Sequence, residues 1–290
     1  LDSIDSQLED LWKSTQSERL VSLARRLAPL KSRCENSLRK LVELDQWLTI
    51  GRWAKQVEAT MPEICEHGIE IKSGRHLLID GIPDPVDYGL GMCAAKDDQQ
   101  SIALLTGANS GGKTTMLELL AHCTILAHMG LPVPAKSAKI GQIESLHVLA
   151  KAGGTQSAGA LEQTLLQLAQ VVSNNDSKLI LADELEAITE PGAGARIIAG
   201  MLEAAESHNG TCMLLVTHLA PAIIEAAGRE LRTDGIEARG LDENLELIVD
   251  RTPRRNHLAR STPELIVRRL VERSQGDAKD VFKSILGRFD

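Results

Sequence analysis

A glycine-rich stretch near the middle of the chain limits its possible folds more than any other feature. Residues 102–105 form an apolar run, Gly107-x-x-x-x-Gly112-Lys113-Thr114 follows, and apolar residues at helical spacing begin at Met116. Strand, glycine loop and helix in this order form a P-loop, in which backbone N–H groups and a helix N-terminus surround phosphate oxygens. The stretch predicts a site for ATP and Mg²⁺, formed by Gly107, Asn109, Gly111, Gly112, Lys113, Thr114 and Thr115.

A second apolar run, residues 178–182, ends in two carboxylates, Asp183 and Glu184. We expect Asp183 to hold Mg²⁺ together with the Thr114 hydroxyl, and Glu184 to orient and polarise the water that attacks the γ-phosphate. Lys113 is expected to neutralise charge on the β- and γ-phosphates. The alternative is a buried strand that meets an acidic turn, but a carboxylate pair downstream of a P-loop favours catalysis.

A third apolar run, residues 212–216, leads to His218. Open α/β sheets bind their ligands at the C-terminal ends of the strands. We therefore predict that His218 senses the γ-phosphate. A purely structural histidine is the alternative.

The charge distribution argues against a broad nucleic-acid-binding surface. The 290 residues carry 32 Lys+Arg and 40 Asp+Glu, a net charge of −8, whereas affinity for DNA comes chiefly from neutralised phosphates. Aromatic residues make up only 2% of the chain, so stacking on single-stranded bases is not favoured. Between Arg19 and Lys40, however, seven basic side chains face one acid, Glu35. This segment is either a solvated helix face or a surface that follows phosphates.

The cysteines predict neither a disulfide framework nor a zinc site, because they are odd in number, far apart and without a C-x-x-C pair. They are Cys34, Cys65, Cys93, Cys123 and Cys212. We interpret them as small buried residues in a reducing compartment. No signal-peptide pattern is found, and apolar stretches such as residues 212–216 are too short to cross a bilayer. We expect a cytoplasmic protein without a membrane segment, and a chain that begins at Leu1 fits a fragment of a longer protein.

Hydrophobic spacing predicts a helical arm over residues 8–57, which Pro29 should kink or divide. Residues 68–80 are predicted as a strand that turns at Ser73-Gly74 and continues, residues 81–91 as a loop, and residues 139–148 as a strand pair. A helix should begin after an N-cap at Ser157, and another should cover residues 192–208.

The C-terminal region is predicted as a hairpin followed by two helices. Residues 236–249 form the hairpin, and Ser261-Thr262-Pro263-Glu264 is a capping box that opens the first helix. The two helices, which run to residue 286, form a helix-turn-helix. Their apolar residues favour packing or dimerisation over DNA binding.

Several of these segments resemble the MutS family of DNA repair ATPases. Residues 106–115 are similar to the family's T-G-P-N-M-G-G-K-S-T, including an asparagine, here Asn109, that ordinary P-loops do not share. Residues 68–76 resemble the strand and G-R-H-P segment that opens the family's ATPase domain, residues 140–144 its I-G-x-I-D, and residues 216–218 its A-T-H. Ser157, followed by Glu162, matches its S-T-F-x-x-E signature helix.

The resemblance implies an α/β P-loop fold of the ABC-ATPase type. Residues 1–58 would be the helical arm and residues 59–290 the ATPase domain, in which residues 261–290 form the helix-turn-helix for dimerisation. In a homodimer, Ser157 would complete the ATP site of the opposite subunit, and Tyr88 would pack on the adenine.

The implied function is ATP binding and hydrolysis, with dimerisation coupled to structure-selective DNA binding in repair or recombination. Mismatch recognition is not implied, because nothing matches the family's Phe-x-Glu wedge and the two phenylalanines are Phe282 and Phe289. An ABC-type ATPase subunit is one alternative, but it would need an L-S-G-G-Q-like signature, which residues 154–157 match only faintly. A dimerisation module held by nucleotide, with incidental turnover, is the other.

Overall fold

The chain folds into two compact units, residues Leu1–Lys55 and Gln56–Asp290, which are described separately. The computed structural model describes residues 2–96, 99–108, 111–150, 158–185, 190–243, 245–259 and 263–289. Asn109 and Ser157, two predicted site residues, lie outside these ranges. No helix in the described ranges is long and apolar enough to cross a membrane.

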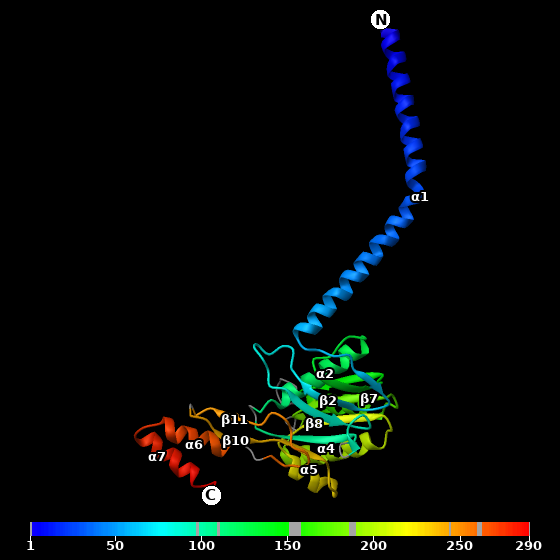
Figure 1. Cartoon of the computed structure of the whole chain (residues 1–290). Coiled ribbons are helices and arrows are strands. Elements are labelled where there is room, and N and C mark those ends of the chain that lie inside the picture. The colour runs from blue at the N-terminus through cyan, green and yellow to red at the C-terminus, as the bar shows by residue number, and fades with distance from the viewer. Residues whose placement is uncertain are drawn as a thin grey trace. The chain divides into compact units, whose positions relative to one another are not determined.

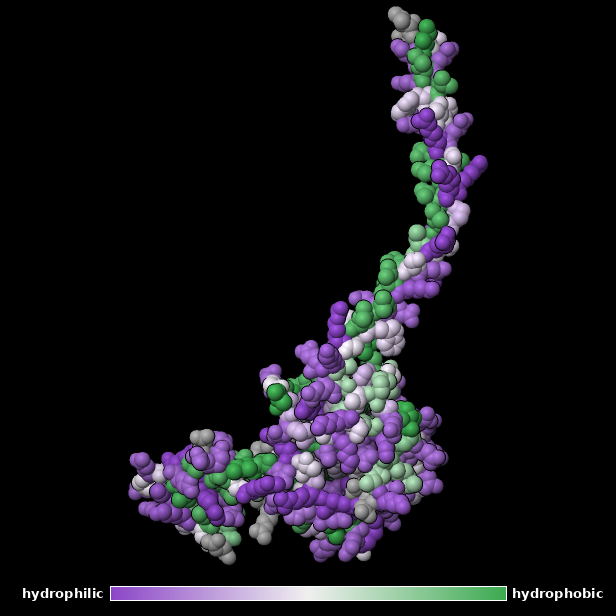
Figure 2. Space-filling view, viewed as in Figure 1, coloured by the Kyte–Doolittle hydropathy of each residue, from purple (hydrophilic) through white to green (hydrophobic). Residues whose placement is uncertain are grey.

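The first unit is a single helix, α1 (Asp2–Gln56), which agrees with the predicted helical arm. The helix continues through Pro29, and Figure 1 shows one clear bend part-way along it, as expected for a helix that contains a proline. Residues 3–49 are all exposed. The apolar residues of α1 therefore lie on its surface, where they form a stripe in Figure 2.

The second unit is built on a parallel sheet with the strand order β6-β7-β8-β4-β9. The strands are β4 (Ile102–Gly107), β6 (Ser145–Leu149), β7 (Lys178–Asp183), β8 (Thr211–Val216) and β9 (Thr233–Ile236). The helices are α2 (Lys113–His128), α3 (Ala158–Ser173), α4 (Pro191–Glu206) and α5 (Ala220–Ala227). The mixed α/β fold with a parallel sheet, predicted from the sequence, is confirmed.

Both faces of this sheet are buried, which explains why its central strands are continuous apolar runs. Leu105, Leu181 and Leu214 point to one core, which they share with α2 and the second sheet. Leu104, Ile180 and Leu215 point to the other core, under α3, α4 and α5. Figure 1 shows α2 on one side of β8 and α4 and α5 on the other.

The second sheet corrects three sequence-based predictions. Its order is β1-β5-β2-β3, formed by β1 (Glu63–Cys65), β2 (Ile69–Gly74), β3 (Val86–Leu90) and β5 (Ser137–Gly141). Strand β2 ends at Gly74 and residues 75–80 are not a strand, whereas the predicted loop of residues 81–91 contains β3. The strands predicted as a pair in residues 139–148 are β5 and β6, which belong to different sheets because β5 pairs with β1 and β2 while β6 pairs with β7.

The C-terminal elements agree with the predicted hairpin and helix pair. Strands β10 (Ala238–Leu241) and β11 (Leu247–Val249) pair antiparallel. Helices α6 (Pro263–Arg273) and α7 (Asp277–Leu286) follow, separated by Gly276 at a φ of +63°. None of the residues of α6 or α7 is buried.

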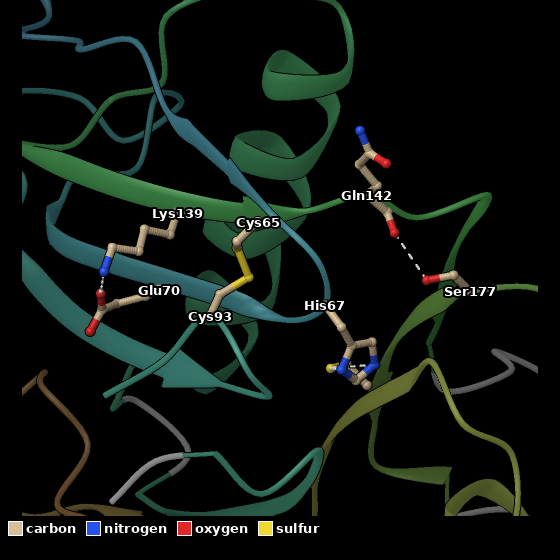
Figure 3. Close-up of a disulfide and its surroundings, with 8 residues drawn as sticks. Cys65, His67, Glu70, Cys93, Lys139, Gln142 and Ser177 are labelled. Carbon is tan, nitrogen blue, oxygen red and sulfur yellow. Dashed lines mark hydrogen bonds and ion pairs between the residues drawn. A yellow bond between two sulfur atoms is a disulfide. The ribbon is translucent and has the colours of Figure 1, made fainter. Parts of the chain in front are cut away.

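The prediction that the cysteines form no disulfide is wrong. Cys65, at the end of β1, is bonded to Cys93, in the turn after β3, with Cα atoms 5.9 Å apart (Figure 3). The Cys93 N–H donates to the His67 carbonyl oxygen at 2.9 Å, which holds the two segments together. The two cysteines are 28 residues apart in the sequence, so only the pairing of distant segments brings them into contact. Of the other three, Cys34 is exposed, and burial raises the pKa values of Cys123 and Cys212 to about 12.

We expect Cys65→Ser to lower the free energy of unfolding by about 3 kcal/mol, because the bond closes a loop of 28 residues in the unfolded chain. Thermal unfolding with and without a reductant measures the effect. Reductant should bring the wild-type midpoint down to that of the variant, and Cys34→Ser, which alters an exposed thiol, is the matched control. Equal midpoints for all three proteins under both conditions would contradict this prediction.

Candidate active site

The P-loop connects the buried strand β4 to helix α2, as the sequence predicts. Gly107 has a φ of +134°, and a Cβ at this position would lie 2.3 Å from the carbonyl oxygen of Ile236 on the neighbouring strand. Gly112 has a φ of +89° and is the N-cap of α2. Both positions favour glycine because of their positive φ angles, and at Gly107 the close approach of the Ile236 carbonyl also excludes a side chain.

Lys113 begins α2 and lies inside the loop. Its side chain is buried, and its Nζ donates to the carbonyl oxygens of Gly107 at 2.8 Å and Ala108 at 2.9 Å. The ammonium group is therefore held by two carbonyl oxygens of the loop. Phosphate oxygens can replace these carbonyls as hydrogen-bond acceptors.

The Thr114 hydroxyl donates to Oδ2 of Asp183 at 2.7 Å, across 69 residues of sequence. Thr114 lies in the first turn of α2 and Asp183 at the C-terminal end of β7. The two side chains predicted to hold Mg²⁺ thus lie together. Their hard oxygen atoms are the kind of ligand that Mg²⁺ prefers.

Glu184 and His218 form a second pair at the same edge of the sheet. His218 Nε2 lies 2.6 Å from Glu184 Oε1. Glu184 has a φ of +48°, and its N–H donates to the Val216 carbonyl oxygen at 3.0 Å, which ties the end of β7 to the end of β8. Such left-handed backbone costs about 1 kcal/mol or more in a residue other than glycine and is common at active sites.

The strand register makes this arrangement possible. Val216 pairs with Leu105 of β4 on one side and with Asp183 of β7 on the other. Strands β7 and β8 therefore end at the same level, and β4 continues two residues further, to Gly107. Strand β8 lies between β4 and β7 in the sheet, so His218, just beyond its end, lies between the P-loop and the carboxylates. The predicted residues Lys113, Thr114, Asp183, Glu184 and His218 converge on one edge of the sheet.

A cavity of about 210 Å³ lies beside the P-loop. Its wall is about equally polar and apolar, and Arg251 forms an ion pair with Asp84 at 3.0 Å on it. A Cβ built on Gly112 would lie 3.5 Å from Arg251 Nη1, so this guanidinium group lies close to the loop. The lining residues are His76, Ile79, Ile82, Pro83, Asp84, Val86, Gly111, Gly112, Thr115, Met116, Leu119 and Arg251.

The sequence did not reveal this cavity, because its walls come from three distant segments. The sequence offers only a group of arginines, Arg251, Arg254 and Arg255, which local spacing does not connect with the P-loop. Beside the cavity, His76 is buried with its Nε2 3.0 Å from Glu118 Oε2, and its ring lies 5.2 Å from that of His122. Burial lowers the pKa of His122, and the neighbouring His76 lowers it further.

Comparison with known proteins identifies the family. The model of MutS domain V matches residues 103–249, which contain the P-loop, both carboxylates and His218. The chain belongs to the MutS family. The matched region is the family's ATPase domain.

Three relatives are similar over most of this MutS-family chain. They are "DNA-binding protein MutS2" of Pyrococcus furiosus (38% identical, 100% of this chain, 51% of that protein), "DNA mismatch repair protein MutS" of Acetivibrio thermocellus (29%, 79% and 26%) and "Endonuclease MutS2" of Clostridium beijerinckii (28%, 85% and 31%). The chain spans about half the length of the first relative and about a quarter to a third of the other two.

Tyr88 does not have the surroundings expected from the family resemblance. It is 6% exposed, and its hydroxyl donates to Asp234 Oδ2 at 3.0 Å. The guanidinium group of Arg232 lies 5.5 Å from the centre of its ring and 2.8 Å from the same carboxylate. This buried cluster joins β3 to β9, and burial leaves no open ring face for a base. The structure therefore argues against adenine stacking by Tyr88.

We expect Glu184→Gln to retain ATP binding and to slow hydrolysis about a hundredfold or more, because the amide cannot accept a proton from the attacking water. ATP binding and phosphate release are measured separately on the same preparation. Glu203→Gln, which changes an exposed carboxylate on α4, is the control and should leave both unchanged. A hydrolysis rate in Glu184→Gln equal to that of the wild type would show that another residue activates the water.

Proposed function

We propose that this chain is the Mg²⁺-dependent, ATP-hydrolysing part of a MutS-like protein that acts on DNA, and that its fold is of the ABC-ATPase type. The observation that carries the proposal is the Thr114–Asp183 hydrogen bond of 2.7 Å, beside the Glu184–His218 pair. One metal ligand comes from helix α2 and the other from strand β7. They meet where a γ-phosphate would extend from the loop.

The chain's own residues supply the chemistry of hydrolysis. Lys113 exchanges its loop carbonyls for β- and γ-phosphate oxygens, and Glu184 orients the attacking water and accepts its proton. His218 holds Glu184 in place through their 2.6 Å contact, and from this position it would sense the γ-phosphate. Mg²⁺, held by Thr114 and Asp183, would neutralise phosphate charge.

The donor set fits Mg²⁺ better than a metal with a full protein cage. In the described part of the chain, no group of three or more His, Cys, Asp or Glu residues could hold a metal ion. Mg²⁺ commonly takes one or two protein oxygens and completes its shell with phosphates and water. Thr114 and Asp183 supply that number.

We assign the nucleoside end of ATP to the cavity beside the loop, and we no longer assign the adenine contact to Tyr88. Its volume of about 210 Å³ suits a base, and Gly111, Gly112 and Thr115 connect it to the phosphate site. Ile82 and Met116 provide apolar walls, while Asp84 and Arg251 provide polar groups at the edge. Most small-molecule sites combine apolar walls with a few polar groups in this way.

The dimer proposed for this chain would use two regions. Helix α3, whose first residue follows Ser157, would direct its N-terminus at the partner's γ-phosphate, which the helix dipole favours. Helices α6 and α7 carry no buried residue, and even their apolar side chains are exposed: Val281 is 58% and Ile266 38% exposed. These apolar side chains support an interface between copies of the chain.

Mixing two inactive variants tests the shared site. Lys113→Ala removes the loop cation from one subunit, and Ser157→Arg blocks the signature helix of the other. If Ser157 acts on the partner's nucleotide, both defects fall at one interface of the mixed dimer, so ATPase activity should partly return. Each variant alone at the same concentration is the control. Heterodimers that form without regaining activity would restrict Ser157 to capping its own helix.

We also propose that the basic residues of α1 contact the DNA backbone, because the net charge of −8 leaves few other surfaces for phosphate. Arg25→Glu with Arg39→Glu should weaken binding to duplex DNA about tenfold or more and reduce its dependence on salt. Fluorescence anisotropy at two salt concentrations measures both effects. Lys96→Glu with Lys136→Glu changes the net charge equally at exposed sites of the second unit and is the control. An equal loss of DNA affinity in the two double variants would show that α1 makes no specific contact with the DNA backbone.

A further inference from the structure

A second cavity lies at the opposite end of the parallel sheet from the P-loop. Its wall includes Ile102, Thr211 and Thr233, which are the first residues of β4, β8 and β9. The P-loop and its cavity lie at the other ends of these strands, and the two cavities share no described residue. The volume of the second cavity is about 1080 Å³, which is large enough for a small-molecule ligand.

The hydroxyl of Thr211 is buried and unpaired. Thr211 is 3% exposed and lines the cavity, and its Oγ1 forms no hydrogen bond with any described residue. An unpaired buried hydroxyl costs about 1 kcal/mol or more, so nearly all such groups have a hydrogen-bond partner in folded proteins. A ligand in the cavity would supply this partner.

The charged side chains of the wall leave one carboxylate unpaired. Arg229 forms an ion pair with Glu206, and Arg232 forms one with Asp234 at 2.8 Å. Glu230 also lines the cavity but has no ion-pair partner in the described part of the chain. Both arginines of the wall are thus neutralised, whereas Glu230 is available to a cation.

Two helices also end at this cavity. Glu206, the last residue of α4, and Ile224, in the last turn of α5, both line it. The C-terminal end of a helix carries about half a negative charge, which attracts cations. His67, another residue of the wall, adds no positive charge at pH 7, because burial lowers its pKa. The helix ends and Glu230 therefore favour a positively charged ligand over a phosphate or a carboxylate.

The uncharged groups of the wall suit a ligand with amines and methylene groups. The side-chain amides of Asn209 and Asn256 bond to no described residue, so their oxygens can accept hydrogen bonds from a ligand. The amide oxygen of Gln100 already accepts from Arg255 at 2.5 Å. Leu258, which is 49% exposed, offers an apolar contact. None of the described lining residues is Phe, Tyr or Trp, so the wall offers no such ring on which a base could stack.

We propose that this cavity binds an aliphatic polyamine, a chain of methylene groups that carries two or more ammonium groups. One ammonium group pairs with Glu230, another donates to Thr211 Oγ1, and the methylene groups lie against the apolar part of the wall. No residue of the ATPase or DNA-binding proposals lines the cavity. The inference therefore goes beyond those proposals and does not depend on them.

Isothermal titration calorimetry on the whole chain, without DNA or nucleotide, tests the proposal with three probes. Putrescine and spermidine carry ammonium groups, whereas butanediol has hydroxyls in place of the two amines of putrescine. At physiological salt both amines should bind at least about tenfold more tightly than butanediol, because charge-assisted hydrogen bonds are about twice as strong as neutral ones. Equal binding of putrescine and butanediol, or no binding of either amine at millimolar concentration, would overturn the proposal.

A pair of charge variants locates the bound amine. Glu230→Gln should weaken spermidine binding about fivefold, through loss of one ion pair. Glu225→Gln changes the net charge equally at an exposed position of α5 that does not line the cavity, and it should leave spermidine binding unchanged. Equal losses in the two variants would reveal a general attraction of polyamines to an acidic protein and would overturn the proposal.

Thr211→Val tests the buried hydroxyl, because valine keeps the shape of the side chain and removes its oxygen. Spermidine binding should weaken about fivefold through loss of one hydrogen bond. The thermal unfolding midpoint of the ligand-free variant should not fall, since the hydroxyl has no partner among the described residues. Unchanged spermidine affinity, or a lower midpoint without ligand, would show that the hydroxyl has a structural role and would overturn its assignment to the ligand.

Discussion

The hydrogen bond between Thr114 and Asp183 depends on the register of three parallel strands. Val216 pairs with Leu105 and with Asp183 at the same time, so β7 and β8 end at one level and β4 continues from that level for two residues, to Gly107 of the P-loop. Because side chains alternate along a strand, a slip of one residue would send them to the opposite face. The buried faces on both sides of the sheet prevent such a slip, since the side chains of residues 212–216 of β8 are all packed in one of the two cores. The geometry of the site is therefore a consequence of core packing.

The features that the sequence predicted well are those set by neighbouring residues. The P-loop, the apolar run before Asp183 and the run before His218 each combine a buried strand with a polar end, and local spacing reveals them. The parallel sheet follows because apolar strands alternate with helical patterns. The roles of Asn109 and Ser157 stay predictions, since both lie outside the described residues.

The features that the sequence missed all need contact between distant segments. Strand β3 has the sequence Val-Asp-Tyr-Gly-Leu next to prolines and glycines, and only its pairing with β2 makes it a strand. The burial of Tyr88 follows from that same pairing. The Cys65–Cys93 bond also needs β5, which joins β1 to β2. Arg251 comes close to Gly112 after 139 residues of chain, which no local pattern can indicate.

A buried lysine links the two halves of the proposed composite site. Lys178 begins β7, the strand that ends at Asp183, and is fully buried. Its Nζ donates to the carbonyl oxygens of Val171 at 2.8 Å and Asn174, at the C-terminal end of α3.

Burial lowers the pKa of Lys178, but the negative end of the α3 dipole and the carbonyl oxygens favour its charged form. If α3 moved away from β7, this ammonium group would lose its acceptors in the core, which costs several kcal/mol. Helix α3 and strand β7 should therefore move as one body. An anion bound at the N-terminus of α3 would then act on the strand that carries Asp183 and leads to Glu184, so a partner's nucleotide could influence hydrolysis without a separate relay.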